Sequence, residues 1–277
     1  MNKTVLITGA SSGFGRSAAE RFAQAGWNVV ATMRTIDAGR DLAALPNALV
    51  TRLDVQDRAS IEQAAAAGIA RFGSIDVLVN NAGFSLFGVF ESIPSEKVKE
   101  QFDVNVFGVM DVTRALLPHF RKKKAGVIVN VSSGAGVFGL PMISLYNASK
   151  FALEGFSESL SYELLGLGIT VKLVEPGGVL ATNFGQRLTA EFAANDGAPA
   201  DYDGFIARTG AVFEELRAER LATSEEVAQV IFEAATDGTE RLRYVATGDI
   251  LPLVKARRES SEEEYIAMMR GKFLRRT

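Results

Sequence analysis

The chain has 277 residues, of which 47% are hydrophobic, enough apolar material for one large α/β domain or two small ones. It contains no cysteine and one histidine, which excludes disulfides, thiolate nucleophiles, cysteine-based metal sites and multi-histidine metal sites. A formal net charge of −3 gives no sign of a nucleic-acid surface or a polybasic membrane patch. Neither a signal peptide nor an apolar run of roughly 18 residues is visible. We therefore expect a soluble cytoplasmic protein without a metal, a nucleic-acid partner or a membrane span.

Short β-branched runs alternate with helical patterns along the first 80 residues. We expect strands at 4–8, 28–33, 48–53 and 75–79, and helices ending at 26 and spanning 58–72. Asp37 is expected to be the N-cap of a helix that follows the second strand. The alternation predicts a parallel sheet with helices on both faces. Ligands of such sheets lie at the carboxyl ends of the strands.

The second half continues this alternation and then becomes less regular. The expected elements are one helix from Ser95, its N-cap, to Phe120, a strand at 127–131, a helix at 145–164, a strand at 169–174, helices at 205–220 and 224–237, and a strand at 243–246. Residues 180–202 have the weak patterning of a long functional loop. The tail from about residue 255 is expected to form a peripheral helix with a solvated polar face. His119 is interpreted as a surface residue near a helix C-terminus, without chemistry.

A glycine-rich segment, TGASSGFG at 8–15, follows the first strand directly and opens the first helix. Gly9, Gly13 and Gly15 permit a tight turn and let backbone N–H groups approach a pyrophosphate at the helix N-terminus. The spacing is GxxxGxG rather than the commoner GxGxxG, and an ordinary βα turn is the alternative interpretation.

The ends of the second and third strands bear on the choice of a dinucleotide. Arg34 follows the second strand, where an acid would bond a ribose 2′-OH and an arginine accommodates a 2′-phosphate. Arg34 therefore favours NADP(H) over NAD(H), with a plain solvated charge as the alternative. Asp54 ends the third strand, where its carboxylate could bond an adenine amino group or cap a turn.

The stretch GVIVNVSSGAGVFGLPMISLYNASK at 126–150 contains the residues best suited to proton transfer. Tyr146 and Lys150 lie four apart on one helix face, and a nearby ammonium favours the phenolate. Ser133 follows the strand and can bond the group with which the tyrosine reacts. YxxxK alone arises by chance. Asn105 lies in mid-helix, where asparagine is unfavoured, so a special role competes with a partly exposed polar residue.

Several motifs in order resemble the short-chain dehydrogenase/reductase superfamily, over the chain up to about residue 250. They are TGASSGFG at 8–15, Asp54-Val55, NNAG at 80–83, Asn105, VNVSS at 129–133, YNASK at 146–150 and PGG at 176–178. The resemblance implies a single Rossmann-like, doubly wound parallel sheet of about seven strands. It also implies that members with arginine after the second strand tend to use NADP(H). The other position where such members carry a basic residue is Ser12 here.

The resemblance also implies a role for each site residue. Tyr146 would be the general acid/base, and Lys150 would lower its pKa and hold the nicotinamide ribose. Ser133, with Ser132 as the alternative, would orient the carbonyl oxygen, and Asn105 would hold a water in the proton relay. Thr182 lies about one residue later than the usual carboxamide contact. The implied cofactor-binding residues are Gly9, Ser11, Ser12, Gly13, Phe14, Gly15, Arg34, Asp54, Val55, Asn81, Ala82, Gly83, Tyr146, Lys150, Pro176, Gly177, Val179 and Thr182.

Within the superfamily, the sequence looks most like the group of 17β-hydroxysteroid and retinol dehydrogenases and bacterial ketoreductases. An apolar pocket around Tyr146 is our hypothesis, with core packing as the alternative for each member. Its expected lining is Phe84, Phe87, Phe138, Met142, Leu145 and Phe184.

The sequence therefore predicts an NADP(H)-dependent oxidoreductase acting on an apolar ketone, aldehyde or alcohol. The alternatives are an NAD-dependent alcohol dehydrogenase and a cofactor-binding sensor without turnover. We expect one domain over 1–250, with a substrate loop at about 180–222, and a C-terminal extension at 251–277. Family members are commonly dimers or tetramers, so a homodimer or homotetramer is expected.

Overall fold

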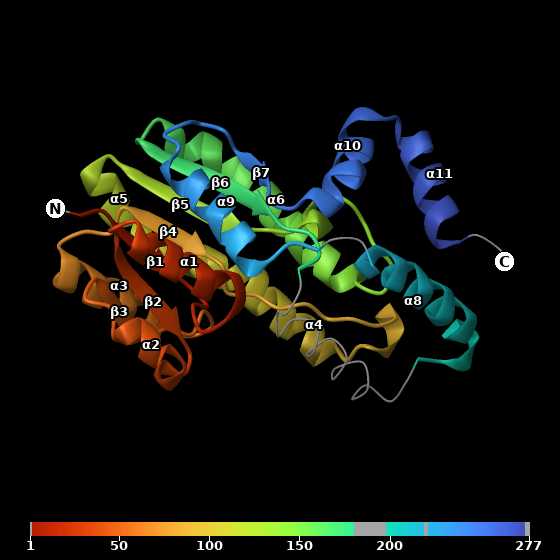
Figure 1. Ribbon diagram of the computed structural model, residues 1–277, viewed down its shortest axis with the longest axis horizontal. Helices are drawn as coiled ribbons and strands as arrows, with labels where there is room; N and C mark the ends of the chain where they lie inside the picture. Colours follow the sequence, from red (N-terminus) through yellow and green to blue (C-terminus); the bar gives the residue numbers. More distant parts are fainter. Residues whose placement is uncertain (1, 180–197, 219–220, 275–277) are drawn as a thin grey trace.

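A computed structural model describes residues 2–179, 198–218 and 221–274, and these residues contain one seven-stranded sheet (Figure 1). The strand order is β3-β2-β1-β4-β5-β6-β7, and every neighbouring pair is parallel. The strands are β1 (Thr4–Ile7), β2 (Asn28–Met33), β3 (Ala48–Arg52), β4 (Val77–Asn80), β5 (Gly126–Val131), β6 (Ile169–Glu175) and β7 (Arg243–Val245). This arrangement confirms the doubly wound α/β fold predicted from the sequence.

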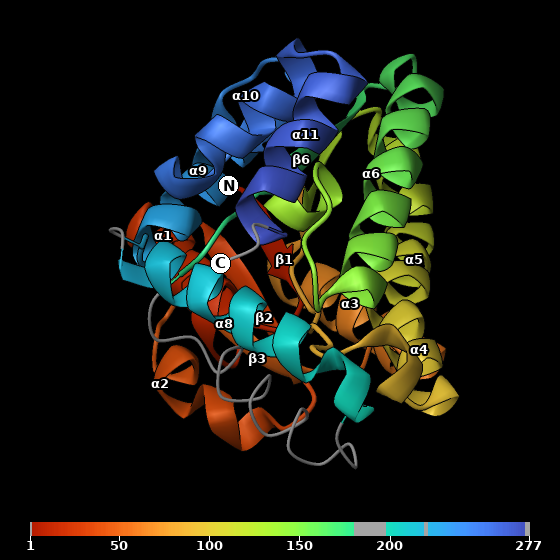
Figure 2. The ribbon, with the colours of Figure 1, turned by 90° about the vertical axis from the view of Figure 1, so that its right-hand side faces the viewer.

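Helices cover both faces of the sheet (Figure 2). One face packs on α1 (Gly13–Gln24), α2 (Arg40–Ala43) and α9 (Ser224–Thr236), and the other on α3 (Arg58–Phe72), α5 (Val109–Lys123) and α6 (Ser144–Leu165). Alternate strand residues supply the two cores, because successive side chains of a strand point to opposite faces. In β1, Val5 and Ile7 join the first core and Leu6 joins the second.

A third group of helices lies together beyond one end of the sheet (Figure 1). It consists of α8 (Asp203–Ala218), α10 (Leu251–Glu259) and α11 (Glu262–Phe273). An apolar cluster that includes Phe138, Phe213, Tyr265 and Phe273 joins α8, α10 and α11 to the segment after β5. The tail thus forms two helices rather than the one peripheral helix expected. A new helix begins after Ser261, whose hydroxyl accepts the Glu264 N–H and caps α11.

The helix expected over 95–120 is interrupted. The chain forms α4 (Ser95–Phe102), a π-helical segment over Asp103–Gly108 and then α5. At the start of α4 the N-cap is Pro94, not Ser95 as predicted. Gly108 packs so closely on Val55 that a Cβ there would lie 2.7 Å from the Val55 Cβ. The π-helical turn is the type of helix irregularity that recurs at functional sites.

Two smaller predictions also differ from the structure. Asp37 lies inside a 3-10 turn (Ile36–Gly39) whose N-cap is Thr35, and it pairs with Arg40 instead of capping a helix. His119 is half-buried rather than on the surface, with its Nε2 3.1 Å from the Ile75 nitrogen. Burial is the main cause that lowers the His119 pKa. Each of these two side chains thus has a structural contact within the chain.

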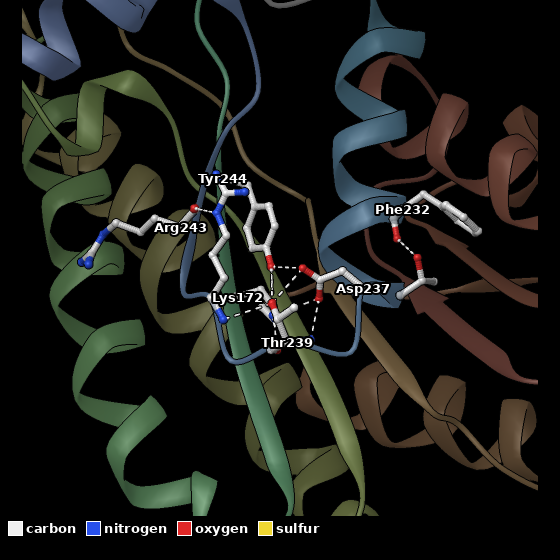
Figure 3. A network of polar contacts seen from close by, with 8 residues as sticks. Lys172, Phe232, Asp237, Thr239, Arg243 and Tyr244 are labelled. Carbon is white, nitrogen blue, oxygen red and sulfur yellow. Dashed lines mark hydrogen bonds and ion pairs between the residues drawn. The ribbon is translucent and has the colours of Figure 1, made fainter.

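The sheet edge at β7 is held by a buried lysine on β6 (Figure 3). The Lys172 ammonium donates to the Tyr244 hydroxyl at 2.9 Å and to the Thr239 carbonyl, and it pairs with Asp237 at 3.3 Å. Burial opposes ionisation of Asp237, but the hydrogen bonds from Tyr244, Thr239 and Lys172 prevail and lower the pKa of this carboxyl. A buried cation is tolerated here because every donor finds an oxygen.

Candidate active site

The sheet has a topological switch point between β1 and β4. The chain runs from β1 outward to β3 on one side, and from β4 outward to β7 on the other. Segments that leave the carboxyl ends of neighbouring strands diverge there and create the crevice in which such sheets bind ligands. Thr8 follows β1, Asn81 follows β4, and Ser133 follows β5 two residues on.

The Thr8 hydroxyl joins the segments after β1 and β4. It accepts the Asn81 N–H at 3.0 Å and the Ala82 N–H at 3.1 Å. The Asn81 amide in turn donates to the carbonyls of Thr8 at 3.0 Å and Gly9 at 3.2 Å. The NNAG motif therefore fixes the shape of the glycine-rich turn, and the Asn81 side chain is engaged in doing so.

The glycine-rich turn has backbone geometry that side chains would prevent. Gly9 and Gly13 have φ of +67° and +54°, a region that favours glycine. A Cβ at Gly15 would lie 2.4 Å from both the Gly9 carbonyl oxygen and the Asn81 Nδ2. Ser12, the N-cap of α1, makes no side-chain capping bond, and no acid occupies the first turn. Backbone N–H groups at this helix start thus suit a dinucleotide pyrophosphate.

Arg34 directly follows β2 and is exposed to solvent. In the sheet, β2 is the neighbour of β1, the strand that leads into the glycine-rich turn. Within residues 2–179, 198–218 and 221–274, the Arg34 guanidinium makes no hydrogen bond or ion pair. With no such partner in the described part of the chain, the guanidinium is available to a phosphate. No acidic side chain occupies the two positions that follow β2, where Arg34 and Thr35 lie.

At the end of β3, Asp54 and Val55 have local partners. The Asp54 carboxylate accepts the Gln56 N–H at 3.1 Å, which is the turn-capping role left open by the sequence. Val55 is buried against Gly108 in the π-helical segment. Both residues therefore shape the loop between β3 and α3, whatever ligand the crevice receives.

Three residues of the expected proton-transfer group lie together at the carboxyl end of β5. Tyr146 and Lys150 are buried in the first turns of α6, and the Lys150 ammonium lies 5.7 Å from the centre of the Tyr146 ring. The same ammonium donates to the Val131 carbonyl at 2.8 Å. Ser133 bonds the Tyr146 hydroxyl, whereas Ser132 is buried with no partner for its Oγ among the described residues. Of the two serines, Ser133 is the one that reaches the tyrosine.

Burial controls the protonation of this group. It raises the pKa of Tyr146 to about 12, against the hydrogen bond from Ser133. It also lowers the pKa of Lys150 to about 8, against the attraction of Glu154. The expectation that Lys150 lowers the Tyr146 pKa is therefore not met in this structure. At neutral pH the tyrosine is a neutral phenol with a proton to donate.

Asn105, in the π-helical segment, has all its side-chain contacts inside the protein. Its Oδ1 accepts the Phe84 N–H at 3.0 Å, and its Nδ2 donates to the Phe84 carbonyl at 2.8 Å and to Ser149 Oγ at 3.1 Å. Asn105 thus links the segment after β4 to α6, between Tyr146 and Lys150. These contacts give the side chain a positioning role.

The PGG motif leaves β6 beside Ser133. The Pro176 carbonyl accepts the Gly134 N–H at 2.8 Å and lies 3.4 Å from Ser133 Oγ. Gly177 and Gly178 donate their N–H groups to Thr247 and Asp249, each at 2.8 Å. Val179 forms an isolated bridge with Ala222, and Thr182 lies outside the described residues. Sequence reasoning missed Thr247 and Asp249, since single polar residues after a short strand carry no motif.

The structure describes five of the six expected substrate-pocket residues, and four of these five are buried. Phe84 and Leu145 are buried in one small apolar cluster, and Phe138 is buried in the C-terminal cluster, so these three are core residues. Met142 is buried with a φ of +64°, and its carbonyl accepts the Gly88 N–H at 2.7 Å. Phe87 remains half-buried. Phe184 lies outside the described residues.

Sequence reasoning also missed the aromatic side chains that the C-terminal helices bring to this region. The Phe87 ring is 6.1 Å from Phe213 on α8, and Phe213 is 6.0 Å from Phe273 on α11. The segment after β4 is thereby connected to both helices through tilted ring contacts. The amphiphilic tail gave a helix signal, but a single sequence does not reveal the surface on which a helix packs.

A parallel sheet with a glycine-rich turn at its switch point and a buried Tyr–Lys–Ser group defines a class of nucleotide-dependent dehydrogenase. Residues 3–192 match the family described as short chain dehydrogenase. Relatives include the uncharacterized oxidoreductase YusZ of Bacillus subtilis, 40% identical over 88% of this chain and 89% of its own. Human 17-beta-hydroxysteroid dehydrogenase type 1 is 35% identical, over 96% of this chain and 84% of its own. The chain belongs to the short-chain dehydrogenase/reductase family and is an oxidoreductase.

Solved structures support the same assignment. A short-chain dehydrogenase from Streptomyces avermitilis has a TM-score of 0.80 and 34% identity, over 96% of this chain and 95% of its own. A family member from Burkholderia phymatum in complex with NAD has a TM-score of 0.79 and 28% identity, over 96% and 95%. ElxO with NADP bound has a TM-score of 0.71 and 26% identity, over 89% and 98%. The family thus includes a chain that binds NAD and another that binds NADP.

Proposed function

We propose that this chain is an NADP(H)-dependent reductase of apolar ketones or aldehydes, which also catalyses the reverse oxidation of the alcohols. The observation that carries the proposal is the buried group of Tyr146, Lys150 and Ser133 at the carboxyl end of β5. When bound, the nicotinamide supplies the hydride that this chemistry requires. The residues of the chain supply binding, orientation and the proton.

Tyr146 donates the proton to the carbonyl oxygen of the substrate. Its raised pKa keeps the phenol protonated at neutral pH, which suits the direction of reduction. Ser133, in hydrogen-bond contact with Tyr146, orients the same oxygen and stabilises the charge that develops on it. Lys150 supplies a positive charge next to the phenol and bonds the ribose of the cofactor. Asn105 holds these elements in register and supports the water of the proton relay.

The cofactor preference rests on Arg34. Its exposed guanidinium after β2 suits the 2′-phosphate of NADP(H), and no acid occupies the two positions that follow β2 to bond a free 2′-hydroxyl. The pyrophosphate would be held by the turn from Gly9 to Gly15. Because a solved relative binds NAD, use of NAD(H) is the competing outcome.

The substrate class rests on the aromatic side chains. Phe87 is the one expected pocket residue among those described that is not buried, and the half-buried Phe213 on α8, 6.1 Å away, extends its apolar surface. The names of two relatives point the same way, since one is a steroid dehydrogenase and another a retinol dehydrogenase. We assign residues 1–250 to the catalytic domain and the region at about 180–222 to substrate binding. Residues 251–277 form its C-terminal extension.

The experiment follows oxidation of NADPH and NADH with ketones and aldehydes of graded apolar bulk. Tyr146→Phe should abolish turnover while leaving cofactor binding intact. The control is Tyr162→Phe, because Tyr162 lies on the same helix and is exposed. Turnover that survives Tyr146→Phe would falsify the mechanism, and reaction of small polar carbonyls alone would overturn the substrate class. Tight cofactor binding without turnover of any substrate would favour a sensor.

We also propose that two copies associate through α5 and α6 and that the protein is cytoplasmic. Phe107, Phe151 and Tyr162 are large exposed side chains on or beside these helices, which suits an interface. None of the helices in the described ranges has the length and apolar character of a membrane span. Light scattering should give the mass of a dimer or tetramer, and Phe151→Lys should lower it. A monomeric mass for the unaltered chain overturns the assembly.

A further inference from the structure

A buried carboxylate lies one helical turn beyond Lys150. Glu154 follows Lys150 by four residues on α6, so the two side chains share one helix face. Both residues are nine-tenths or more buried. Glu154 Oε2 accepts a bond from Arg243 Nε at 3.0 Å, whereas Oε1 has no hydrogen-bond partner among the described residues. The proposed reaction does not itself use this acid.

Glu154 is packed into the segment that carries the serines. A Cβ at Gly136 would lie 2.8 Å from Ser132 Oγ, 2.9 Å from Glu154 Cγ and 3.2 Å from the Lys150 carbonyl oxygen. The glycine therefore lets α6 and the loop after β5 approach closely. Glu154 packs against the same loop that holds Ser133.

The carboxylate belongs to a cluster that extends from α6 to the C-terminal helices. Arg243 on β7 also pairs with Glu158 at 2.5 Å and lies 3.6 Å from Glu175, the buried last residue of β6. Arg258 on α10 pairs with Glu175 at 2.6 Å. Three carboxylates thus face two arginines, and the cluster becomes neutral only when the Lys150 ammonium is counted with it.

Since the chain has been proposed to work as a reductase that needs a charged Lys150, this cluster has a consequence for turnover. We propose that Glu154 is a positioning residue whose carboxylate keeps Lys150 protonated at the pH of catalysis. Among the described residues Lys150 has no carboxylate within ion-pair distance. The attraction between the Glu154 carboxylate and the Lys150 ammonium therefore acts through the buried interior. Such an interior screens charge much less than water does.

The electrostatic balance at Lys150 includes groups on four elements. On α6 they are Tyr146, Glu154 and Glu158; β6 adds Glu175, β7 adds Arg243 and α10 adds Arg258. Burial lowers the pKa of Lys150 to about 8, and Glu154 is the group that opposes this. Burial raises the pKa of Glu175, and Glu154 adds to the rise. Removal of the Glu154 charge therefore makes the ammonium easier to deprotonate.

Glu154→Gln is the central test, with Glu158→Gln as its matched control. Glutamine preserves the shape and can still accept the bond from Arg243, so the substitution removes mainly the charge. Glu158 lies one turn further along α6 and pairs with the same arginine, but its side chain is 42% exposed. In Glu154→Gln the alkaline limb of the kcat/KM profile should move to lower pH by about one unit. In Glu158→Gln it should stay in place.

Two further measurements separate positioning from a structural role. Arg243→Gln leaves Glu154 less neutralised, so the alkaline limb should move to higher pH, the opposite direction. Nitrogen-15 NMR of labelled lysine in the cofactor-free protein, with Lys150→Met for assignment, should show the same shifts without any substrate. Unchanged titration of Lys150 in both variants overturns the proposal, even where stability falls. If the Lys150 titration moves as expected in both variants but the protein turns over no carbonyl, the result would contradict the proposed function and not the role of Glu154.

Discussion

Asn105 holds both peptide groups of Phe84, accepting its N–H at 3.0 Å and donating to its carbonyl at 2.8 Å. This pair of bonds fixes the backbone directly after the NNAG motif, next to Tyr146. A third bond, to Ser149 at 3.1 Å, ties the same asparagine to α6. The π-helical turn around Asn105 therefore connects the segment after β4 to the helix that carries the proton donor.

Asn105→Ala should destabilise the fold and reduce turnover together. The Phe84 N–H loses its acceptor inside the protein, and an unsatisfied buried donor costs about 1–3 kcal/mol. Denaturant unfolding measures the loss of free energy, and kcat reports the displacement near Tyr146. Asn105→Asp keeps the acceptor for the Phe84 N–H, but it turns an uncompensated carboxylate oxygen toward the Phe84 carbonyl inside the protein, so it should lose at least as much stability. A smaller loss in Asn105→Asp than in Asn105→Ala would contradict this account.

Arg34→Asp should reverse the preference between the two cofactors. The new carboxylate repels a 2′-phosphate and can bond the 2′-hydroxyl of NAD(H), so kcat/KM for NADPH should fall about 100-fold relative to NADH. Steady-state kinetics with both cofactors gives this ratio. Arg71→Asp is the control, because Arg71 is also exposed but lies at the far end of α3. A ratio unchanged by Arg34→Asp would show that other residues select the cofactor.

The buried ammonium of Lys150 makes stability depend on pH. Its pKa falls from 10.5 to about 8 on folding, so the unfolded chain binds more protons between these values. Stability therefore rises as pH increases from about 8 to 10.5. Lys150→Met should be more stable than the parent chain at pH 7 by about 3 kcal/mol, and the gap should close by pH 10.5. Urea unfolding at several pH values measures the gap, and a constant gap would contradict the burial effect.

Substitution of Asp237 should lower stability strongly only while Lys172 is present as a charged ammonium. Asp237→Ala deprives a buried ammonium of its counter-ion and should cost about 3 kcal/mol. In the double variant Lys172→Met/Asp237→Ala no uncompensated charge remains, so part of the loss should return. Thermal and urea unfolding of the four chains complete the cycle. Additive losses would mean that the two groups are not coupled through the network of Figure 3.

The single variant also has a pH signature. Asp237 has a lowered pKa in the folded chain, so its stabilising effect is present above the unfolded value of about 4 and fades as pH falls below it. The difference in stability between the parent chain and Asp237→Ala should accordingly shrink under acidic conditions. Unfolding at pH 3 and pH 7 checks the direction.

Much of this fold was readable from sequence because its determinants are local. β-branched runs such as Val127–Val131 predict buried strands, and TGASSGFG predicts the turn with its positive φ angles at Gly9 and Gly13. The grouping of Tyr146, Lys150 and Ser133 followed from helix geometry together with the position of one strand end. The strand, the turn and the Tyr146–Lys150 pair each depend on residues within a few positions of each other, and Ser133 joins the pair because it follows a strand end.

The remaining features depend on contacts between distant segments. Burial of Tyr146, which raises its pKa rather than lowering it, depends on packing that no local pattern encodes. Phe84 and Leu145 were expected to line a pocket, but they share a core cluster. The π-helical segment at Asn105 and the docking of α11 on α8 likewise arise from tertiary contacts. A helical pattern indicates an apolar face but not the surface that covers it.

The hydroxyl of Thr8 accepts the N–H groups of Asn81 and Ala82, which lie 73 and 74 positions further along the chain. Until residue 82 has been synthesised and β4 has joined β1, the glycine-rich turn lacks the bonds that fix its shape. During translation, the first 80 residues therefore emerge with the motif for a nucleotide and without the means to hold one. Nucleotide affinity depends on the turn after β1 and the segment after β4 together. It should therefore be acquired late in folding, and it should be lost early in unfolding, when β4 separates from β1.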